Sequence, residues 1–451
     1  MRYEINHKDF RYITDNSNEC DENTAFFLCE QNKKYLQKAK QNNPPAIIMI
    51  DEYKKLLDID DIKIIGITGT NGKTTTAAII YSLLLDLGYG CALQGTRGVF
   101  INDEKLEGKT LTTPLIFNTL NHIKEAKDRG CEYFVMEVSS HAIVQNRIEG
   151  LEFALKVFTN LTQDHLDYHK TFEEYKRVKE SFFLDETPKL INKDAKKINF
   201  NIKNAFTYAL DLPATYNITS YTLKDGISAV VRNFDKMEHF HSNLYGLFNV
   251  YNLLAAIASV SITTKKPLKE ICEQVENFAG VSGRMEVISQ EPLIIVDFAH
   301  TPDGMDKVLD SLKDYDISLV FGAGGDRDKS KRPQMGRVAN RYAKKIYLTS
   351  DNPRSEDPQT ILDEIEQGIT NKDKLRYKNI DRKKAIQKAY EELEDKEILV
   401  VLGKGDEDYQ EIDGVKHPFD DREILRELFK SDATNWKRDK CYKRNFYRGF
   451  S

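Results

Sequence analysis

The chain has 451 residues, of which 40% are hydrophobic and 30% are charged. This length is too great for one hydrophobic core, so we expect a globular protein of two to four domains. The formal net charge of −5 argues against a nucleic-acid-binding protein, whose surface would be basic.

The six cysteines are scattered along the chain without a CxxC pair. This pattern favours free thiols in a reducing compartment over a disulfide framework or a zinc site. The first ten residues, MRYEINHKDF, lack the apolar stretch of a signal peptide. No segment approaches the roughly 20 apolar residues that a membrane span needs. We therefore expect a cytoplasmic protein that handles small molecules.

The pattern of apolar segments predicts an α/β protein of three domains. Residues 1–60 form a short N-terminal unit that ends in a buried-type strand followed by polar residues. From residue 61, strand-like segments alternate with helical patterns such as 115–129, which predicts a parallel sheet covered by helices. Residues 186–245 are short, polar and β-prone, and we expect them to form a small excursion from the main sheet. Four further strand-and-loop units within 281–451 predict a second α/β domain with a poorly ordered basic tail.

Residues 66–80, GITGTNGKTTTAAII, lie between the strand-like run IKIIGI and a helical pattern that ends near Gly88. A strict phosphate-binding loop would have glycine where Ile67 stands. However, free backbone N–H groups at a strand-to-helix junction bind phosphate oxygens, so we prefer a phosphate loop to an ordinary glycine turn. We predict that Lys73 reaches the outer phosphates and that the Thr74 hydroxyl binds magnesium. The predicted nucleotide-binding residues of the loop are Gly69, Thr70, Asn71, Gly72, Lys73, Thr74 and Thr75.

Two further segments place metal-binding side chains after strands. Glu137 ends the strand in FVMEVSSH, where a carboxylate often holds magnesium directly or through its neighbours. In TNLTQDHLDYH, Asp164 and His165 follow the next strand. A metal-binding role and a structural role are equally compatible with His165 at this position.

The segment TFEEYKRVKESFF places Lys179 on an aromatic helix face. Phe172, Tyr175, Lys179 and Phe182 follow one another at helical spacing. Spacing alone favours a lysine whose stem is buried and whose ammonium reaches water. The alternative is a desolvated amine with a lowered pKa, which can add carbon dioxide and become a carbamate that binds magnesium.

Taken together, the motifs resemble those of the Mur ligase family. They run in that family's order from about residue 66 to 423. The matching segments are GTNGKTTT, TTP (112–114), EVSSHAIVQNR, FTNLTQDHLDYH, YKRVK, GLFNVYN, GRME, DFAHTPDG, GGDRDKSKRP, DNPRSEDP, GKGDEDYQ and FDDRE.

The resemblance implies an ATP-dependent ligase that forms an amide bond through an acyl phosphate. It implies a UDP-recognising N-terminal domain, a central ATPase with a parallel sheet and a Rossmann-like C-terminal domain that receives the amino acid. By the same resemblance, Lys179 is the family's carbamylated lysine, and Lys73, Lys179 and His165 are catalytic. Magnesium is held by Thr74, Glu137, His165 and Lys179, and further nucleotide contacts come from Asn249, Arg284 and Asp297.

The substrates implied are UDP-N-acetylmuramoyl-L-alanyl-D-glutamate and an amino acid. The residues expected at the UDP substrate are Ser17, Thr112, Thr113, Ser139, Gln145 and Arg147. Arg354 in DNPR follows the strand KKIYLTS, and its guanidinium is matched to the distal carboxylate of meso-diaminopimelate, which L-lysine lacks. The residues expected at the diaminopimelate are Arg327, Asp351, Asn352, Pro353, Arg354, Gly403 and Glu407. We expect a monomer without a nucleic-acid partner.

Two positions depart from the family pattern. The N-terminal unit is short and retains only Ser17 of an aspartate-serine-arginine turn that contacts the uridine. Asp406 stands where a histidine is common. The remaining alternatives are a ligase that uses L-lysine, a folylpolyglutamate synthetase-like ligase, the next Mur ligase of the pathway, and a nucleotide-binding regulator without turnover.

Overall fold

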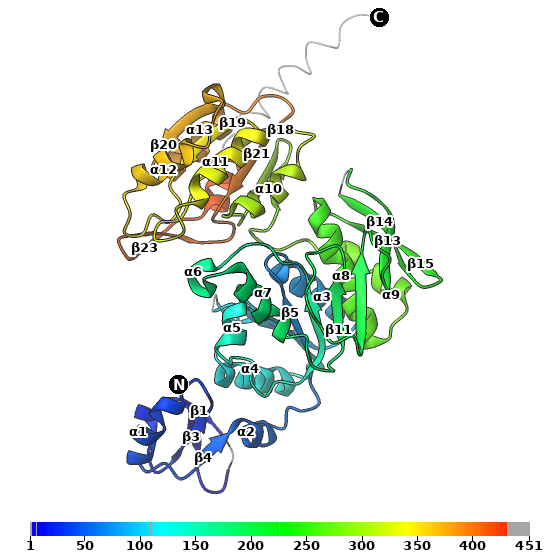
Figure 1. Ribbon diagram of the computed structural model, residues 1–451, viewed down its shortest axis with the longest axis vertical. Helices are drawn as coiled ribbons and strands as arrows, with labels where there is room; N and C mark the ends of the chain where they lie inside the picture. The colour runs from blue at the N-terminus through cyan, green and yellow to red at the C-terminus, as the bar shows by residue number, and fades with distance from the viewer. Residues whose placement is uncertain (1, 6, 109–110, 225, 431–451) are drawn as a thin grey trace, which may run out of the picture. The chain divides into compact units, whose positions relative to one another are not determined.

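The computed structural model describes residues 2–5, 7–108, 111–224 and 226–430 (Figure 1). Their tertiary contacts divide the chain into two compact units. Unit 1 comprises residues 1–243 and 248–279, and unit 2 comprises residues 244–247 and 280–451. The predicted basic tail, with Cys441, lies outside the described residues. The predicted domain boundaries at residues 60 and 280 remain predictions, because contacts do not measure independent folding.

Unit 1 begins with a four-stranded sheet in the order β1-β2-β3-β4. The first pair is antiparallel, and the other two pairs are parallel. The elements of this region are β1 (Arg2–Glu4), β2 (Tyr12–Thr14), η1 (Ser17–Glu19), β3 (Thr24–Leu28), η2 (Lys33–Tyr35), α1 (Leu36–Gln41), β4 (Ile47–Met49) and α2 (Ile50–Leu57).

The larger sheet of unit 1 has eleven strands, and its centre is parallel. In spatial order its strands are β15 (Lys236–Ser242), β14 (Ile227–Asn233), β13 (Tyr216–Thr222), β12 (Ala205–Ala209), β11 (Lys189–Asn192), β10 (Phe153–Phe158), β5 (Lys63–Thr68), β9 (Tyr133–Glu137), β6 (Cys91–Gly95), β7 (Gly98–Ile101) and β8 (Glu104–Glu107). The central strands β5 and β9 are buried along almost their whole length, as parallel strands covered on both faces are.

The predicted excursion from the main sheet at residues 186–245 is wrong. Strands β11 to β15 from this region continue the main sheet: β12 pairs with β11, and β13 to β15 are added beyond β12. The antiparallel strand β14 buries every second residue at its start. Such alternation makes outer strands look polar in sequence although they belong to the same sheet.

Helices cover this sheet, and their bounds follow the sequence patterns closely. The helix predicted at 115–129 is α4, and Gly88 follows the end of α3 with a φ of +86°. The helices are α3 (Lys73–Asp86), α4 (Ile116–Asp128), α5 (Ser140–Val144), α6 (Leu166–His169), α7 (Phe172–Ser181), α8 (Leu247–Thr264), α9 (Leu268–Cys272) and η3 (Val275–Asn277). Within the described parts of the chain, α8 alone is long and apolar enough to cross a membrane, but 67% of it is buried in the protein, as in a core helix.

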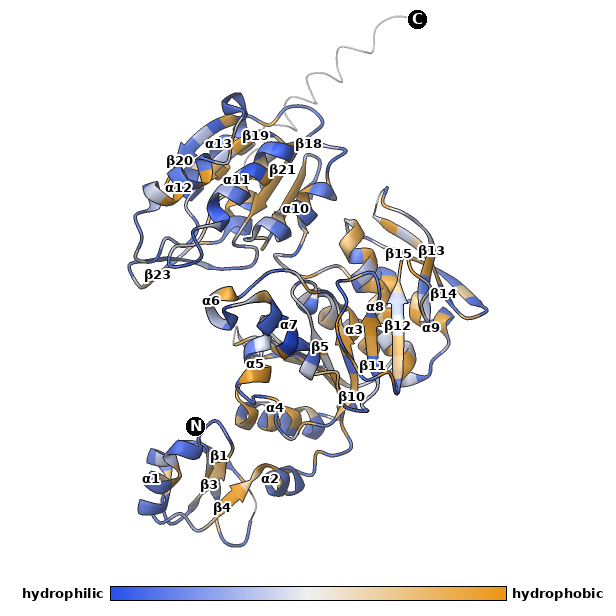
Figure 2. Ribbon diagram, viewed as in Figure 1, coloured by the Kyte–Doolittle hydropathy of each residue, from blue (hydrophilic) through white to orange (hydrophobic). Residues whose placement is uncertain are grey.

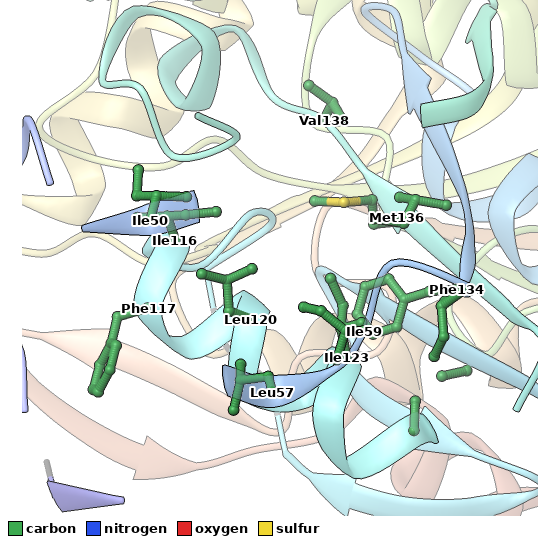
Figure 3. Packing of buried hydrophobic residues seen from close by; sticks show 14 of the residues in the cluster. Ile50, Leu57, Ile59, Ile116, Phe117, Leu120, Ile123, Phe134, Met136 and Val138 are labelled. Atoms are coloured by element: carbon green, nitrogen blue, oxygen red, sulfur yellow. The ribbon is translucent and has the colours of Figure 1, made fainter. Parts of the chain in front are cut away.

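The core of unit 1 joins α2, α4 and β9 (Figure 3). Ile116, Leu120 and Ile123 lie on one face of α4 at helical spacing and are completely buried. They pack with Leu57 at the end of α2 and with Phe134 of β9. Burying each such side chain contributes about 1.5–3 kcal/mol. This core fixes the edge of the sheet from which Glu137 projects.

Unit 2 is a six-stranded sheet in the order β16-β17-β21-β18-β19-β20. Within this sheet all strand pairs except β16–β17 are parallel, as in a Rossmann-like domain, while β22 and β23 form a separate antiparallel pair. Its strands β18 and β21 are hydrophobic and α11 is largely hydrophilic (Figure 2). The elements are β16 (Glu286–Gln290), β17 (Leu293–Asp297), α10 (Pro302–Asp310), β18 (Asp316–Phe321), α11 (Lys331–Tyr342), β19 (Ala343–Thr349), α12 (Pro358–Glu366), η4 (Lys372–Lys374), β20 (Leu375–Asn379), α13 (Arg382–Glu391), β21 (Glu397–Leu402), β22 (Tyr409–Ile412) and β23 (Val415–Pro418), and residues 421–430 are helical.

Candidate functional site

The register of three parallel strands aligns the start of the phosphate loop with Glu137 and with the segment that leads to Asp164 and His165. Ile67 of β5 pairs with Glu137 of β9, and Thr68 of β5 pairs with Phe158 of β10. The loops that follow these strands therefore meet at one edge of the sheet, where α/β proteins bind ligands.

The loop at residues 69–72 ends at the first residue of α3, as a phosphate loop requires. Gly72 has a φ of +84°, and a Cβ there would lie 2.5 Å from Oδ1 of Asn252. Only glycine fits this position, because both the backbone angle and the space exclude a side chain. Asn252 in turn donates to Oδ1 of the predicted nucleotide residue Asn249 at 2.9 Å. The N-terminus of α3 thus presents its backbone N–H groups to the loop.

The segment that follows β10 holds the loop in place. The Thr70 hydroxyl donates to the carbonyl of Thr162 at 3.1 Å, and the Asn71 N–H donates to Oδ1 of Asn160 at 2.9 Å. Nζ of Lys73 donates to the carbonyls of Gly69 and Thr70, both at 2.9 Å. The Lys73 ammonium therefore contacts the loop that is predicted to bind the phosphates. The next predicted residue, Thr75, is buried within α3.

Glu137, the last residue of β9, is a buried carboxylate that contacts the start of α3. Its Oε2 accepts from the Thr74 hydroxyl at 2.9 Å, and its Oε1 accepts from the Thr96 N–H at 2.9 Å. A hydroxyl and a carboxylate at this distance are oxygen donors of the kind that Mg²⁺ prefers.

Lys179 lies on the opposite side of the same loop. Its side chain is 1% exposed, and its Nζ donates to the carbonyl of Gly69 at 2.9 Å and to the Thr68 hydroxyl at 3.3 Å. The Gly69 carbonyl thus accepts from both Lys73 and Lys179. Burial lowers the pKa of the Lys179 amine well below its usual range, and the nearby Lys73 charge lowers it further. The expectation that the ammonium reaches water is wrong.

His165 stands just before α6 with a φ of +52°. Burial lowers its pKa to about 4, against the opposing effect of Asp164. The imidazole is neutral at pH 7 and can act as a ligand.

The residues predicted to hold the UDP substrate form a connected group, with one exception. Oγ1 of Thr113 donates to the carbonyl of Glu137 at 2.9 Å and accepts from the Ser139 N–H at 3.0 Å. Arg147 donates to the carbonyl of Thr113 and to Oε1 of Gln145, and the Thr112 hydroxyl contacts that of Thr96 at 3.1 Å.

Ser17 is the exception among these predicted residues. It is buried in η1, where its carbonyl accepts from Asn42. Among the described residues it makes no hydrogen bond to the rest of the group. A different residue of the N-terminal region reaches the group: the Gln31 amide donates to the carbonyl of Gln145 at 3.0 Å.

In unit 2, the predicted amino-acid site lies on the loops after β18, β19 and β21. Nη1 of Arg354 donates to the carbonyl of Gly325 at 2.7 Å, and its Nε lies 3.3 Å from Oε2 of Glu411. Nδ2 of Asn352 donates to Oε2 of Glu407 at 2.8 Å. Arg327 is exposed, and a Cβ on Gly324 would lie 3.9 Å from its Cγ and 3.0 Å from Nη1 of Arg354.

The other predicted residues line the base of this loop cluster. Asp351 and Pro353 are buried, and Oδ2 of Asp351 has no hydrogen-bond partner among the described residues. A Cβ on Gly403 would lie 2.4 Å from that oxygen. The Gly403 N–H donates to the carbonyl of Asp297 at 3.1 Å, so the base of the amino-acid site is continuous with a predicted nucleotide residue.

Arg284 and Asp297 also belong to unit 2. Oxygens of the buried Asp297 carboxylate accept from the N–H groups of Met285 and Ala299 at 2.8 and 2.7 Å. Burial raises the pKa of Asp297, while Arg284 and the two N–H groups oppose that rise. The Arg284 guanidinium lies 4.4 Å from the centroid of the Phe298 ring, a stacked arrangement typical of arginine.

Two family models match the chain over the regions that carry this geometry. The Mur ligase middle domain matches residues 67–260, and the Mur ligase, glutamate ligase domain matches residues 283–405. A protein from Wolinella succinogenes named UDP-N-acetylmuramoyl-L-alanyl-D-glutamate--2,6-diaminopimelate ligase is 52% identical over 422 residues, which cover 93% of this chain and 97% of that protein. The chain belongs to the Mur ligase family.

Further comparisons support this membership. A protein of the same name from Helicobacter pylori is 47% identical over 434 residues, covering 94% of this chain and 96% of that protein. A solved structure with this name has a TM-score of 0.68 at 31% identity, and it covers 93% of this chain and 95% of the other. As a Mur ligase, the chain is an ATP-dependent ligase that forms an amide bond, and this family uses ATP and Mg²⁺. A regulator without turnover is therefore disfavoured.

The sequence interpretation missed several residues of this Mur ligase site. The ring of His141 lies 5.0 Å from that of His165 and 4.1 Å from that of Tyr168. His169 is buried and contacts the Ser140 hydroxyl at 2.9 Å. The sequence does contain a signal for both, because VSSH directly follows Glu137 at the end of β9 and LDYH directly follows the Asp164–His165 pair. Lys404, completely buried beside Glu407, was missed as well.

The predicted magnesium set fits a hard cation only in part without a modified lysine. Over the described ranges, no group of three or more His, Cys, Asp and Glu side chains is placed to bind a metal. Thr74 and Glu137 are joined by a hydrogen bond, and the charges of Lys73 and Lys179 both lower the pKa of His165. These residues lie around one loop, and a carbamate on Lys179 would add a second anionic oxygen ligand to that of Glu137.

Proposed function

We propose that this Mur ligase adds meso-diaminopimelate to UDP-N-acetylmuramoyl-L-alanyl-D-glutamate, a step of peptidoglycan precursor synthesis. The names of the relatives at 47–52% identity support this substrate pair. The observation that carries the choice of amino acid is the loop Asn352–Arg354 at the carboxyl end of β19. The Arg354 guanidinium has more N–H donors than its contacts to Gly325 and Glu411 use. Such a group of donors matches the two oxygens of a carboxylate.

The chemistry requires positioning and charge stabilisation more than a protein nucleophile. The free carboxylate of the dipeptide attacks the γ-phosphorus of ATP, ADP leaves, and an acyl phosphate forms. The amine of the amino acid then attacks the acyl carbon, phosphate leaves, and the nitrogen loses a proton as the amide forms. Negative charge spreads over oxygens in both steps, and Lys73 with the N–H groups of α3 would stabilise it.

Lys179 would enter this reaction as a carbamate. Its amine, deprotonated because of its lowered pKa, adds to the carbon of carbon dioxide and releases a proton. The carbamate carries one negative charge, shared between its two oxygens, and would attract the Lys73 ammonium. Thr74, Glu137, His165 and the Lys179 carbamate would hold Mg²⁺, which when bound neutralises the charge of the transferred phosphoryl group.

The remaining assignments follow the grouping of the side chains. Thr112, Thr113, Ser139, Gln145 and Arg147 would hold the UDP-muramoyl dipeptide beside Glu137. Thr113 links the last three to the Glu137 carbonyl, and Thr96 links Thr112 to the Glu137 carboxylate. A contact between Ser17 and the uridine of this substrate is also part of the proposal. Asn249, Arg284 and Asp297 would contact the nucleotide. We also propose that the protein is a monomer located in the cytoplasm.

Phosphate release tests the proposed ligase directly. The purified protein is incubated with ATP and Mg²⁺, with either co-substrate alone and with both. We expect sustained phosphate release only when the UDP-muramoyl dipeptide and meso-diaminopimelate are both present, because the acyl phosphate turns over only through the amine. Equal release with ATP alone would contradict the proposal and indicate an ATPase without ligation.

A further inference from the structure

Lys404 is a completely buried lysine inside the predicted amino-acid site. Its Nζ lies 3.0 Å from Oε2 of Glu407 and 3.1 Å from Oδ1 of Asn352. The ring of Tyr409 lies 5.5 Å from the same nitrogen. Because a buried charge is costly unless it is paired and hydrogen-bonded, these contacts fix the ammonium in one place.

This ammonium also fixes how Asn352 and Glu407 face the site. Oδ1 of Asn352 accepts from Lys404 and from the Glu411 N–H at 2.9 Å. Two donors on Oδ1 determine the orientation of the amide, so its Nδ2 must point to Oε2 of Glu407. Oε2 of Glu407 thus accepts two hydrogen bonds, one from Asn352 and one from Lys404. Oε1 of Glu407 accepts none from the residues that the structure describes. Oε1 is left as the oxygen that an incoming ammonium would meet.

The charges of this site are paired before any amino acid binds. Lys404 balances Glu407, and Arg354 is balanced by Glu411 at 3.3 Å. Behind them, Arg382 and Asp421 form a completely buried pair. The two remaining charged residues of the predicted set, Arg327 and Asp351, are of opposite sign. A side-chain end with one net charge would therefore add an unbalanced charge to a site whose own charges are already paired.

We infer that Lys404 is a positioning and specificity-determining residue that makes the distal subsite select a zwitterionic end over a lone ammonium. An ammonium bound to Oε1 of Glu407 also feels the repulsion of Lys404 across the same carboxylate. A carboxylate on the same carbon, held near Arg354, offsets that repulsion. The substrate L-lysine has a distal ammonium but no distal carboxylate, so the repulsion between its ammonium and that of Lys404 is not offset. This inference rests on the proposed function and adds a residue to its amino-acid site.

The experiment compares three amino acids that differ only at the distal end. Ligation to the UDP-muramoyl dipeptide is measured with meso-diaminopimelate, L-lysine and 2-aminopimelate, whose distal end carries only a carboxylate. For the wild type, kcat/KM should be high for the first and low for both singly charged compounds. In Lys404→Met, the ratio of kcat/KM for lysine to that for diaminopimelate should rise roughly tenfold or more, because Glu407 is no longer neutralised. KM for ATP should stay unchanged.

Lys345→Met is the matched control. Lys345 is also a buried lysine of unit 2, and its Nζ lies 2.9 Å from both Glu394 and Glu397. Its loss should lower the melting temperature, as Lys404→Met does, without a change in the selectivity ratio. Lys404→Gln provides a second neutral variant if Lys404→Met does not fold.

Two results would overturn the inference. One is a selectivity ratio in the folded Lys404 variant equal to that of the wild type. The other needs only wild-type protein: a kcat/KM for 2-aminopimelate as high as that for meso-diaminopimelate, which would contradict the premise that a distal ammonium meets Glu407 beside Lys404. Failure of the proposed function is distinct from both, because the wild type would then add none of the three amino acids.

Discussion

The amines of Lys73 and Lys179 share the Gly69 carbonyl as an acceptor. Two cations at one oxygen repel each other, and burial adds to the cost of the second charge. The neutral amine of Lys179 relieves part of that cost, and a carbamate would turn the repulsion into attraction. The burial of Lys179, which is costly for an ammonium, is therefore explained if the side chain carries a carbamate.

Lys179→Ala tests this use. The variant should lose most ligase activity, and short carboxylates such as acetate or propionate should restore part of it, because they can supply anionic oxygen in the vacated space. Ligation rates are measured with and without added carboxylate. Lys176→Ala is the control: it lies on the same helix, where its Nζ is 3.6 Å from Glu180, and it should retain activity. Full activity of Lys179→Ala would contradict the carbamate.

The depth of Lys179 shows where a sequence pattern stops being informative. Helical spacing correctly predicts that it shares a face with Tyr175 and Phe182, and all three are buried. Spacing cannot tell whether the ammonium at the end of the stem reaches water, because that depends on which loop the helix covers. The same holds for Lys404, whose partners Asn352 and Glu407 come from two different loops.

At the scale of elements, the strand–loop–helix of β5 and α3 is the best-determined part of the site. Lys73→Ala should remove the cation from the outer phosphates and lower kcat/KM by about 100-fold or more. Lys63→Ala is the matched control, because Lys63 begins the same strand at its opposite end and its Nζ contacts the Tyr133 hydroxyl at 3.2 Å. Ligation by Lys73→Ala at the rate of the control would contradict the phosphate-loop assignment.

The sequence predicts the central elements well and the outer ones poorly. Strands β5, β9 and β10 are mainly apolar runs, α3 is a long apolar segment, and α4 and α7 have a clear helical period, so their positions follow from local pattern. Strands β13 to β15 have seven residues each and pair with strands close along the chain, but they lie on one side of the sheet and carry many polar residues. Local pattern identifies such strands but not the sheet that they join. The register that pairs Ile67 with Glu137 is likewise a tertiary property.

At the scale of the whole molecule, the proposed reaction needs groups from both units. The phosphate loop, Glu137 and Lys179 belong to unit 1, and Arg354, Asn352 and Glu407 belong to unit 2. An acyl phosphate is open to hydrolysis, so the amine must reach it while water is excluded, and domain closure is the usual means. The amino-acid specificity therefore depends on unit 2, while the activation of the carboxylate depends on unit 1.

A competition between two amino acids tests the central claim most directly. The wild-type protein is given ATP, Mg²⁺, UDP-N-acetylmuramoyl-L-alanyl-D-glutamate and equal concentrations of meso-diaminopimelate and L-lysine, and the products are identified by mass spectrometry. We predict the diaminopimelate adduct almost alone, and a mixture of both adducts when Arg354→Ala replaces the wild type. Equal amounts of the two adducts from the wild type would contradict the proposed specificity, and the absence of any adduct would contradict the ligase function itself.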